Sequence, residues 1–422
     1  MLRLSIAPLL MWLAACPGPK HAQPDGAAPL TTPVGRDGKS LRGVAGDGTT
    51  VFAALASQAS STLEARRGDS IAWSAVIPGN AGVLALGGGT LYAALVDPQV
   101  RGQPGSAVAA LDPASGALRW SRAFHATEWA TISSLAPIEG GAVAGGSFSG
   151  TLRIGDRVVS SAGKADGFVV RLDGTGAPLW LVRVGGPHAD AVQGLAVSGS
   201  RIAVAGTFAS GAELAGVLLP AFDERTPYAD GFVAELDANG RRAWAASFGG
   251  KRDDAVAGVA IDASGRVVAA GTIRESAHVG GADLVAQGDA DGVVAWWSRV
   301  GGAQHAVLIG GPDFDGVRGI TAVGDRIGVA GFFSGQMRLG DRTLAAGGGD
   351  DSFIAALDDH GAVLDGWQIG GAGREEITAI ASVPGGFIAG VAHTAEADLA
   401  GAALPAPKDP FAGAAIMVRP VR

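Results

Sequence analysis

Short apolar runs separated by glycine-containing turns repeat along most of this chain. The repeated pattern, G-L-A-V-x-G-x-x-I-A-V-A-G-T, is clearest at Gly194–Thr207, Gly258–Thr272 and Gly319–Phe332. Weaker copies bring the total to seven and lie at Gly43–Ala56, Gly82–Val96, Ile132–Phe148 and Ala379–Ala392. Because the apolar runs are short and bounded by turn residues, the pattern predicts buried strands joined by tight hairpins, and it predicts no helix.

A second kind of hairpin follows each copy of the first. Its six complete copies lie at Leu63–Val76, Ala107–Phe124, Phe168–Val184, Phe232–Phe248, Val293–Ile309 and Phe353–Ile369, and a seventh stops after one strand at Ala414–Pro420. The turn often has the form Leu-Asp-x-x-Gly, as in Leu236–Gly240, in which the Asp caps the turn and the Gly takes a left-handed conformation. A Trp lies just past the turn in four copies, at Trp73, Trp120, Trp180 and Trp244.

Two hairpins per repeat give four strands, and repeats of four strands round an axis are the blades of a β-propeller. Copies of the second hairpin begin at Asp166, Asp230, Asp291 and Asp351, in steps of 64, 61 and 60 residues. The sequence therefore predicts an all-β, seven-bladed propeller of four-stranded antiparallel blades. Because the last blade lacks its outer strand, we expect the segment Thr31–Asp37 to supply it and to close the ring.

Composition agrees with one large β-rich body. The chain has 422 residues, of which 47% are hydrophobic and 68 are glycine. Repeats that stack on one another form a single body, so residues 33–422 are expected to be one propeller domain. The net charge of −8 and the absence of a strongly basic block argue against nucleic acid as a partner.

The N-terminal residues resemble a bacterial lipoprotein signal. Met1–Arg3 is a short charged start, Leu4–Leu13 is an apolar run, and small residues precede Cys16, the only cysteine. This interpretation makes residues 1–15 a signal peptide and Cys16 a lipidated N-terminus, and the alternative is an ordinary secretory signal. Residues 16–32 are rich in proline and predict an extended tether. We therefore expect a lipid-anchored protein on the periplasmic or outer-membrane side of a bacterial cell envelope.

The run DGFVAELDANGRRAWAASFGGKRDDAVAGVAIDASGRVVAAGT from Asp230 resembles the bacterial β-propeller repeat of secreted and lipid-anchored proteins. The L-D-x-x-G-x-x-x-W half of the unit is also similar to the blades of quinoprotein-type propellers. The resemblance covers roughly residues 41–421 and is strongest from the third to the sixth repeat. It implies a blade architecture rather than an activity, because propellers host enzymes, binders and scaffolds alike.

Acidic residues occupy equivalent positions in four connections between repeats, at Asp190, Asp254, Asp315 and Glu375. If the strand that follows each acid is the innermost one, the four carboxylates surround the mouth of the central channel. Such a partial ring could hold a calcium ion or a basic ligand group. The alternative interpretation is structural, with each acid accepting hydrogen bonds from backbone N–H groups of its own connection.

The connections between the two hairpins are the longest parts of each repeat. Ser149–Ala165 and Ser334–Asp350 resemble each other and predict an extra small hairpin in each blade. The less regular connection Ala209–Ala229 carries Phe222, Arg225 and Tyr228, which are candidates for contact with a partner. In the doublet Trp296–Trp297, strand alternation places one ring on each face, and an exposed ring could stack on a sugar or peptide.

The sequence names no reaction. It contains no phosphate-binding loop, no G-x-S-x-G elbow and no cysteine or histidine cluster with metal-ligand spacing. We therefore expect a monomeric, non-catalytic binding or scaffold module for an envelope protein or polysaccharide, with no cofactor unless calcium binds. One alternative is a propeller enzyme, either a quinoprotein-like dehydrogenase or a hydrolase or lyase, with its site at the channel mouth. A second alternative is a lectin-like glycan binder.

Overall fold

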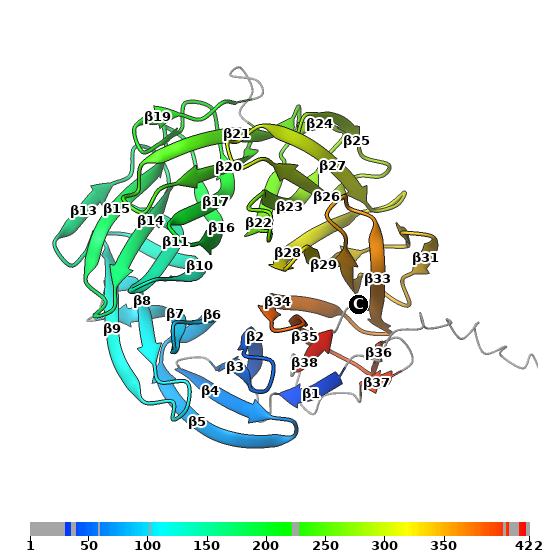
Figure 1. Ribbon diagram of the computed structural model, residues 1–422, viewed down its shortest axis with the longest axis horizontal. Coiled ribbons are helices and arrows are strands. Elements are labelled where there is room, and N and C mark those ends of the chain that lie inside the picture. The colour runs from blue at the N-terminus through cyan, green and yellow to red at the C-terminus, as the bar shows by residue number, and fades with distance from the viewer. Residues whose placement is uncertain are drawn as a thin grey trace, which may run out of the picture.

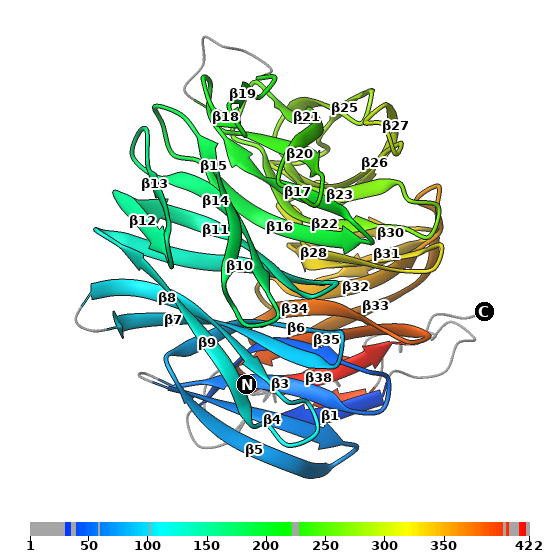
Figure 2. The same cartoon turned by 60° about the vertical axis from the view of Figure 1, so that its left-hand side comes forward.

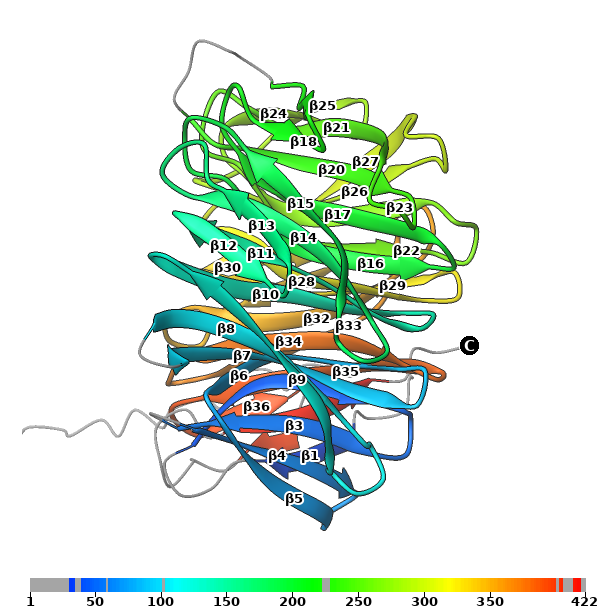
Figure 3. The same cartoon turned by 90° about the vertical axis from the view of Figure 1, so that its left-hand side faces the viewer.

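The computed structural model describes residues 30–34, 39–57, 60–100, 103–221, 228–399, 402–404 and 413–418. All regular elements in these ranges are strands, and none of the described residues form a helix long and apolar enough to span a membrane. Figure 1 shows the sheets arranged round a central axis, and Figures 2 and 3 show them stacked from the side. The predicted all-β propeller is confirmed. Cys16, the predicted signal peptide and the predicted tether lie outside the described residues.

Six blades each take their four core strands in chain order, from the innermost strand to the outermost. Blade 1 has β2 (Ser40–Gly46), β3 (Val51–Ala56), β4 (Ser60–Arg67) and β5 (Ser70–Pro78). Blade 2 has β6 (Asn80–Gly87), β7 (Thr90–Val100), β8 (Gln103–Leu111) and β9 (Leu118–Ala126). Blade 3 has β10 (Trp129–Ile138), β11 (Gly141–Ser149), β14 (Asp166–Asp173) and β15 (Pro178–Gly185).

The next three blades repeat this order. Blade 4 has β16 (Ala191–Ser198), β17 (Arg201–Phe208), β20 (Asp230–Leu236) and β21 (Arg242–Gly250). Blade 5 has β22 (Ala255–Ile261), β23 (Val267–Ile273), β26 (Asp291–Trp297) and β27 (Ala303–Ile309). Blade 6 has β28 (Asp315–Val323), β29 (Arg326–Phe333), β32 (Asp351–Leu357) and β33 (Val363–Gly371). These strands match the predicted hairpins of the first six repeats.

The seventh repeat differs from the other six because its sheet combines both ends of the chain. This terminal sheet has β34 (Glu375–Val383), β35 (Gly386–His393) and β38 (Gly413–Val418), followed by β1 (Leu30–Val34). β1 pairs with β38 in antiparallel register, with Leu30 opposite Met417 and Val34 opposite Gly413. Six blades are thus built from single stretches of chain, whereas the predicted seven-fold count and ring closure depend on this composite sheet and are taken up below as a proposal.

Five small hairpins lie in the connections between second and third strands: β12 (Thr151–Ile154) with β13 (Arg157–Ser160), β18 (Glu213–Leu214) with β19 (Val217–Leu218), β24 (Ser276–Val279) with β25 (Ala282–Val285), β30 (Gln336–Leu339) with β31 (Arg342–Ala345), and β36 (Ala397–Leu399) with β37 (Ala402–Leu404). Four of them extend the outer strand of the preceding blade, and the β30–β31 hairpin touches it through a bridge between Gly310 and Arg338. The prediction of an extra hairpin within each blade is therefore wrong in placement, because these hairpins clasp neighbouring blades together. It also fails for the first two blades.

Adjacent blades are further joined by three of the four tryptophans that follow the turns. The indole nitrogens of Trp73, Trp120 and Trp180 donate hydrogen bonds of 2.8–2.9 Å to carbonyls of Pro113, Gly174 and Ala238, each in a turn of the following blade. In blade 5, His305 occupies the position on the fourth strand that a tryptophan has in the earlier blades. Its ring stacks on Trp296, with the ring centroids 4.4 Å apart. Trp296 and Trp297 are both fully buried, so neither ring of the doublet is available for stacking on a ligand.

Candidate functional site

The four predicted connector acids lie at or just before the innermost strands of blades 4, 5 and 6 and the terminal sheet. All four are at most 3% exposed. Asp190 accepts 2.8 Å hydrogen bonds from the N–H groups of Gly186 and Ala209. These bonds tie the connection before blade 4 to the end of β17, which fits the structural interpretation of the acid.

Asp254 and Asp315 occupy the same place in the next two blades. Asp315 accepts hydrogen bonds from the N–H groups of Gly311 at 2.6 Å and Ser334 at 3.2 Å. Asp254 accepts one from the N–H of Arg274 at 2.8 Å. None of the four acids is among the residues that line the central cavity.

Glu375 differs from the three aspartates. Both of its carboxylate oxygens are buried without a hydrogen-bond partner among the described residues. It lies opposite His393 in the β34–β35 register, and the His393 ring nitrogen Nδ1 is 2.9 Å from the carbonyl oxygen of Ala395. One extra methylene separates the Glu375 carboxylate from its backbone, which explains why it does not repeat the short bonds of the aspartates.

A second row of buried acids was not singled out by sequence reasoning. Each is the first residue of a third strand, and the row comprises Asp166, Asp230, Asp291 and Asp351, none more than 6% exposed. Asp166 accepts hydrogen bonds from Ala162 N–H and from the Arg183 guanidinium, at 3.0 and 2.9 Å. The sequence signal for this row is the Asp at the start of each D-G-F-V-type run.

Each acid of the second row is electrostatically coupled to the connector acid that leads into the next blade. Burial, with a smaller contribution from the neighbouring carboxylates of Asp230, Asp291 and Asp351 respectively, raises the pKa of Asp254, Asp315 and Glu375 to about 7. Burial, with Asp166 as a smaller cause, also raises the pKa of Asp190. The connector acids at the blade junctions are therefore disfavoured in their charged form, first by burial and then by a nearby second carboxylate.

Two consecutive glycines, a G-G motif, begin the same connections, and the buried acids explain why a side chain is not tolerated there. A side chain on Gly310 would collide with the Asp291 carboxylate, and one on Gly311 would collide with the backbone of Gln336 in the clasping hairpin. Gly249 and Gly250 face Asp230 and Ser276 in the same way. The glycines thus allow an acid and a hairpin backbone to approach the same strand end.

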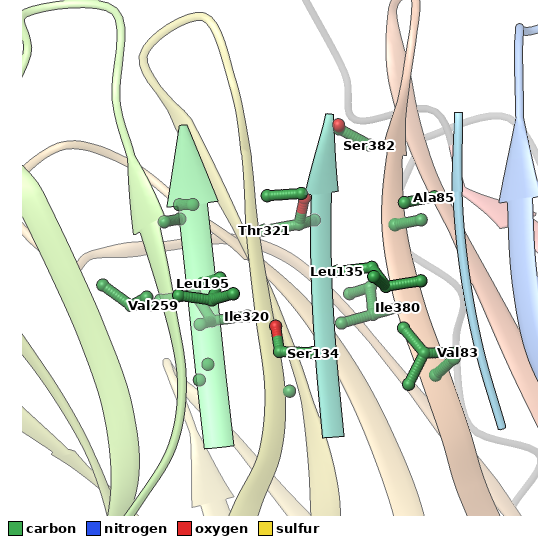
Figure 4. Close-up of a pocket in the computed structure, with 18 of the residues that line it drawn as sticks. Val83, Ala85, Ser134, Leu135, Leu195, Val259, Ile320, Thr321, Ile380 and Ser382 are labelled. Carbon is green, nitrogen blue, oxygen red and sulfur yellow. The ribbon is translucent and has the colours of Figure 1, made fainter. Parts of the chain in front are cut away.

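The innermost strands surround a central cavity of about 420 Å³. Each of these strands carries a β-bulge at the same position, which leaves one residue out of the ladder: Arg42, Gly82, Ser133, Gln193, Ala257, Arg318 and Thr378. Figure 4 shows Leu135, Leu195, Ile320 and Ile380 at about the same level of this cavity. Among the described residues that line it, Arg318 is the only charged one.

Arg318 also belongs to a strip of two phenylalanines flanked by two arginines, at the end of the propeller where the connector acids lie. We define the arginine–aromatic strip as Arg274, Phe314, Phe332 and Arg318. The Arg274 guanidinium carbon lies 5.3 Å from the ring centroid of Phe314, and that of Arg318 lies 4.9 Å from that of Phe332. The two phenylalanine rings are 5.4 Å apart. Both arginines are exposed and both rings are half-buried.

Of the predicted partner-contact residues, Phe222 and Arg225 lie outside the described residues. Tyr228 is half-buried, and its hydroxyl accepts a 3.4 Å hydrogen bond from Arg252. Arg252 also makes an exposed ion pair with Glu275, at 2.7 Å. Tyr228 therefore lies beside a guanidinium whose charge is already paired.

Asp358, Asp359 and His360 form a metal-like cluster in the outer turn of blade 6. Asp359 is bonded to His360 and lies 3.3 Å from the Arg266 guanidinium, and Asp358 accepts backbone N–H groups of its own turn. These partners explain the cluster as turn structure.

No protein-family model matches the chain, and no curated protein matches it. Solved structures with similar chain paths include the computationally designed Ika8 protein, at 13% identity and a TM-score of 0.48 over 93% of this chain and 99% of that one. The WD40 domain of Toxoplasma gondii coronin has 10% identity and a TM-score of 0.47, over 91% and 84%. A europium-containing methanol dehydrogenase has 13% identity and a TM-score of 0.40, over 86% and 84%. These similarities are too weak to support an argument about activity.

Proposed function

We propose that the protein is a non-catalytic binding module that holds a polymer of the bacterial cell envelope. The observation that carries this proposal is the arginine–aromatic strip, which presents two exposed guanidinium groups held on rings at the end of the propeller that carries the connector acids. The connector acids of the same end are turned into the blade junctions, where they accept backbone N–H groups. The buried acids therefore hold the blades together, and the exposed arginines remain available to bind a ligand.

The anchor is part of the same proposal. Lipidation of Cys16 and the tether of residues 16–32 would hold the propeller at a membrane surface, where envelope polymers are concentrated. Replacing Cys16 with Ser should release the exported protein from the membrane fraction. Retention of the Cys16→Ser protein in the membrane would contradict the anchor.

We also propose that the terminal sheet is a seventh blade and that β1 closes the ring. The pairing of β1 with β38 supports this, as does the pairing of β35 with both β34 and β38. With β1 on one side and β35 on the other, β38 would have no unpaired edge, and an unpaired edge is where another chain could associate.

The direct test is capture from envelope extracts with the exported, detergent-solubilised chain as bait. We expect a carbohydrate-containing polymer to be enriched above a bait of equal charge that has been heat-unfolded. Capture of a protein alone would favour the scaffold alternative. A new absorbance band after addition of a quinone cofactor with calcium would favour the enzyme alternative.

A further inference from the structure

The arginine–aromatic strip brings together side chains from two blades and the connection between them. Arg274 follows β23 of blade 5, Phe314 lies just before β28, and Phe332 and Arg318 lie within β29 and β28 of blade 6. Gly316 has no side chain, and a Cβ there would lie 2.9 Å from the Phe332 ring, so this glycine gives the ring room to lie beside β28. The strip ends at Arg318, which also lines the central cavity.

The two guanidinium groups of the strip are fixed but not neutralised. Within the described part of the chain, neither has an ion pair or a side-chain hydrogen bond, and Glu275, next to Arg274, is engaged by Arg252. Asp313, which directly precedes Phe314, is also exposed and forms no ion pair with either arginine in the described part of the chain. A guanidinium that rests on an aromatic face keeps its N–H edges free for a planar, bidentate acceptor. The strip is therefore organised for carboxylates.

We propose that the arginine–aromatic strip binds the carboxylates of a uronic-acid polysaccharide. A single exposed ion pair contributes little, so a free monocarboxylate would bind weakly, whereas a polymer with regularly spaced carboxylates engages both arginines at once. This inference rests on the proposed function and names the class of polymer.

An acidic peptide fits the strip less well than a polysaccharide. Extended peptides gain much of their affinity by adding a strand to an open sheet edge. β29, which carries Phe332, is paired on both sides, with β28 and with β32. β28, which carries Arg318, has one unpaired edge, but that edge faces the central cavity and not the outer surface. The strip therefore offers side-chain groups to a ligand, and side-chain contacts are sufficient to bind a polysaccharide.

The test uses the exported full-length protein with Arg274→Gln and Arg318→Gln combined. A control with the same change in charge is Arg153→Gln with Arg157→Gln, since both residues are exposed on the β12–β13 hairpin away from the strip. Binding of polygalacturonate, dextran and poly-glutamate is measured by calorimetry at low salt. We expect polygalacturonate to bind the wild-type and control proteins, and the strip variant to bind it about five-fold or more weakly.

Equal binding by the strip variant, or equal affinity for poly-glutamate and polygalacturonate, would overturn the inference. Thermal melting of each variant shows whether a loss of binding reflects unfolding, and the pair Arg274→Lys and Arg318→Lys, which keeps the charge but not the bidentate geometry, should recover only part of the affinity. Envelope capture separates the two proposals. If the wild-type protein captures no polymer, the proposed function fails, and if wild type and strip variant capture it equally, only the strip assignment fails.

Discussion

Trp180 and Ala238 join blades 3 and 4 through a single hydrogen bond, in which the indole N–H of Trp180 donates to the Ala238 carbonyl at 2.9 Å. The same ring lies against Gly240, two residues further along that turn, where φ is +77°. A Cβ on Gly240 would be 2.9 Å from the indole. The turn motif Leu-Asp-x-x-Gly therefore serves two purposes, a left-handed turn and a flat seat for the tryptophan of the preceding blade.

Gly240→Ala is expected to destabilise the protein more than its backbone conformation alone requires. A left-handed alanine costs about 1 kcal/mol, and displacement of the indole adds about 1–3 kcal/mol. Gly199→Ala is the matched control, because Gly199 has φ +61° but nothing lies within 4 Å of its Cβ position. Urea unfolding of both variants measures the difference. Equal losses of stability would show that the Trp180 contact contributes nothing.

Gly310→Ala tests whether the G-G motif exists to make room for a buried acid. The added methyl would collide with the Asp291 carboxylate, which is fully buried and accepts a 2.6 Å hydrogen bond from the N–H of Gln287. We expect a loss of about 2–3 kcal/mol in the free energy of unfolding. Gly349→Ala, at a position with open space and an ordinary φ, should change stability by less than about 0.5 kcal/mol. A similar effect for both would refute this explanation of the motif.

The sequence pattern predicts the hairpins well because turn residues and short apolar runs are local signals. Even the weak copy near Gly82 became β6 and β7, and the lone strand near Ala414 became β38. Blade clasping was not predictable in the same way. Whether the β12–β13 hairpin pairs with its own blade or the preceding one depends on the angle between blades, which leaves no trace in the residues of the hairpin.

The candidate site was predicted in part for a similar reason. The acids at positions such as Asp315 were identified from their spacing, and the structural interpretation included N–H donors of the same connection, such as Gly311. Spacing does not reveal the second donor, Ser334, which follows β29. Likewise Arg274 and Phe314 are separated by forty positions in the chain, so only the packing of blade 5 on blade 6 brings them into contact. Local pattern placed the residues on their strands and connections, and tertiary packing decided which neighbours they have.

Removal of β1 tests the closure proposal. A chain that begins at Gly35 lacks β1 and leaves β38 with an unpaired edge, so we expect a lower melting temperature and association into larger species. A chain that begins at Leu30 retains β1 and is the control. Size-exclusion chromatography with light scattering measures both. Two monomers of equal melting temperature would contradict closure by β1.

The buried carboxyl pairs predict that stability falls as pH rises from about 4 to about 7. Burial raises the pKa of Asp254, Asp315 and Glu375 to about 7, so over this range the folded state binds more protons than the unfolded state. Each such group can contribute a slope of at most about 1.4 kcal/mol per pH unit, and the slope ends once the folded-state groups are ionised.

Asp254→Asn isolates one of these groups. The amide can still accept the hydrogen bond that the Asp254 carboxylate takes from Arg274 N–H, but it does not titrate, so the decline in unfolding free energy between pH 4 and 7 should become shallower. Asp156→Asn, an exposed change of equal charge, should leave the decline unchanged. The aspartates of the turns titrate in a lower pH range. The pKa of Asp112 is lowered by hydrogen bonds, chiefly the one from the Arg119 side chain, so the stability that Asp112 contributes is lost only as the pH falls below 3.8. If the free energy of unfolding of the wild-type protein rises steadily from pH 4 to 7, burial does not raise the pKa of the acids at the blade junctions.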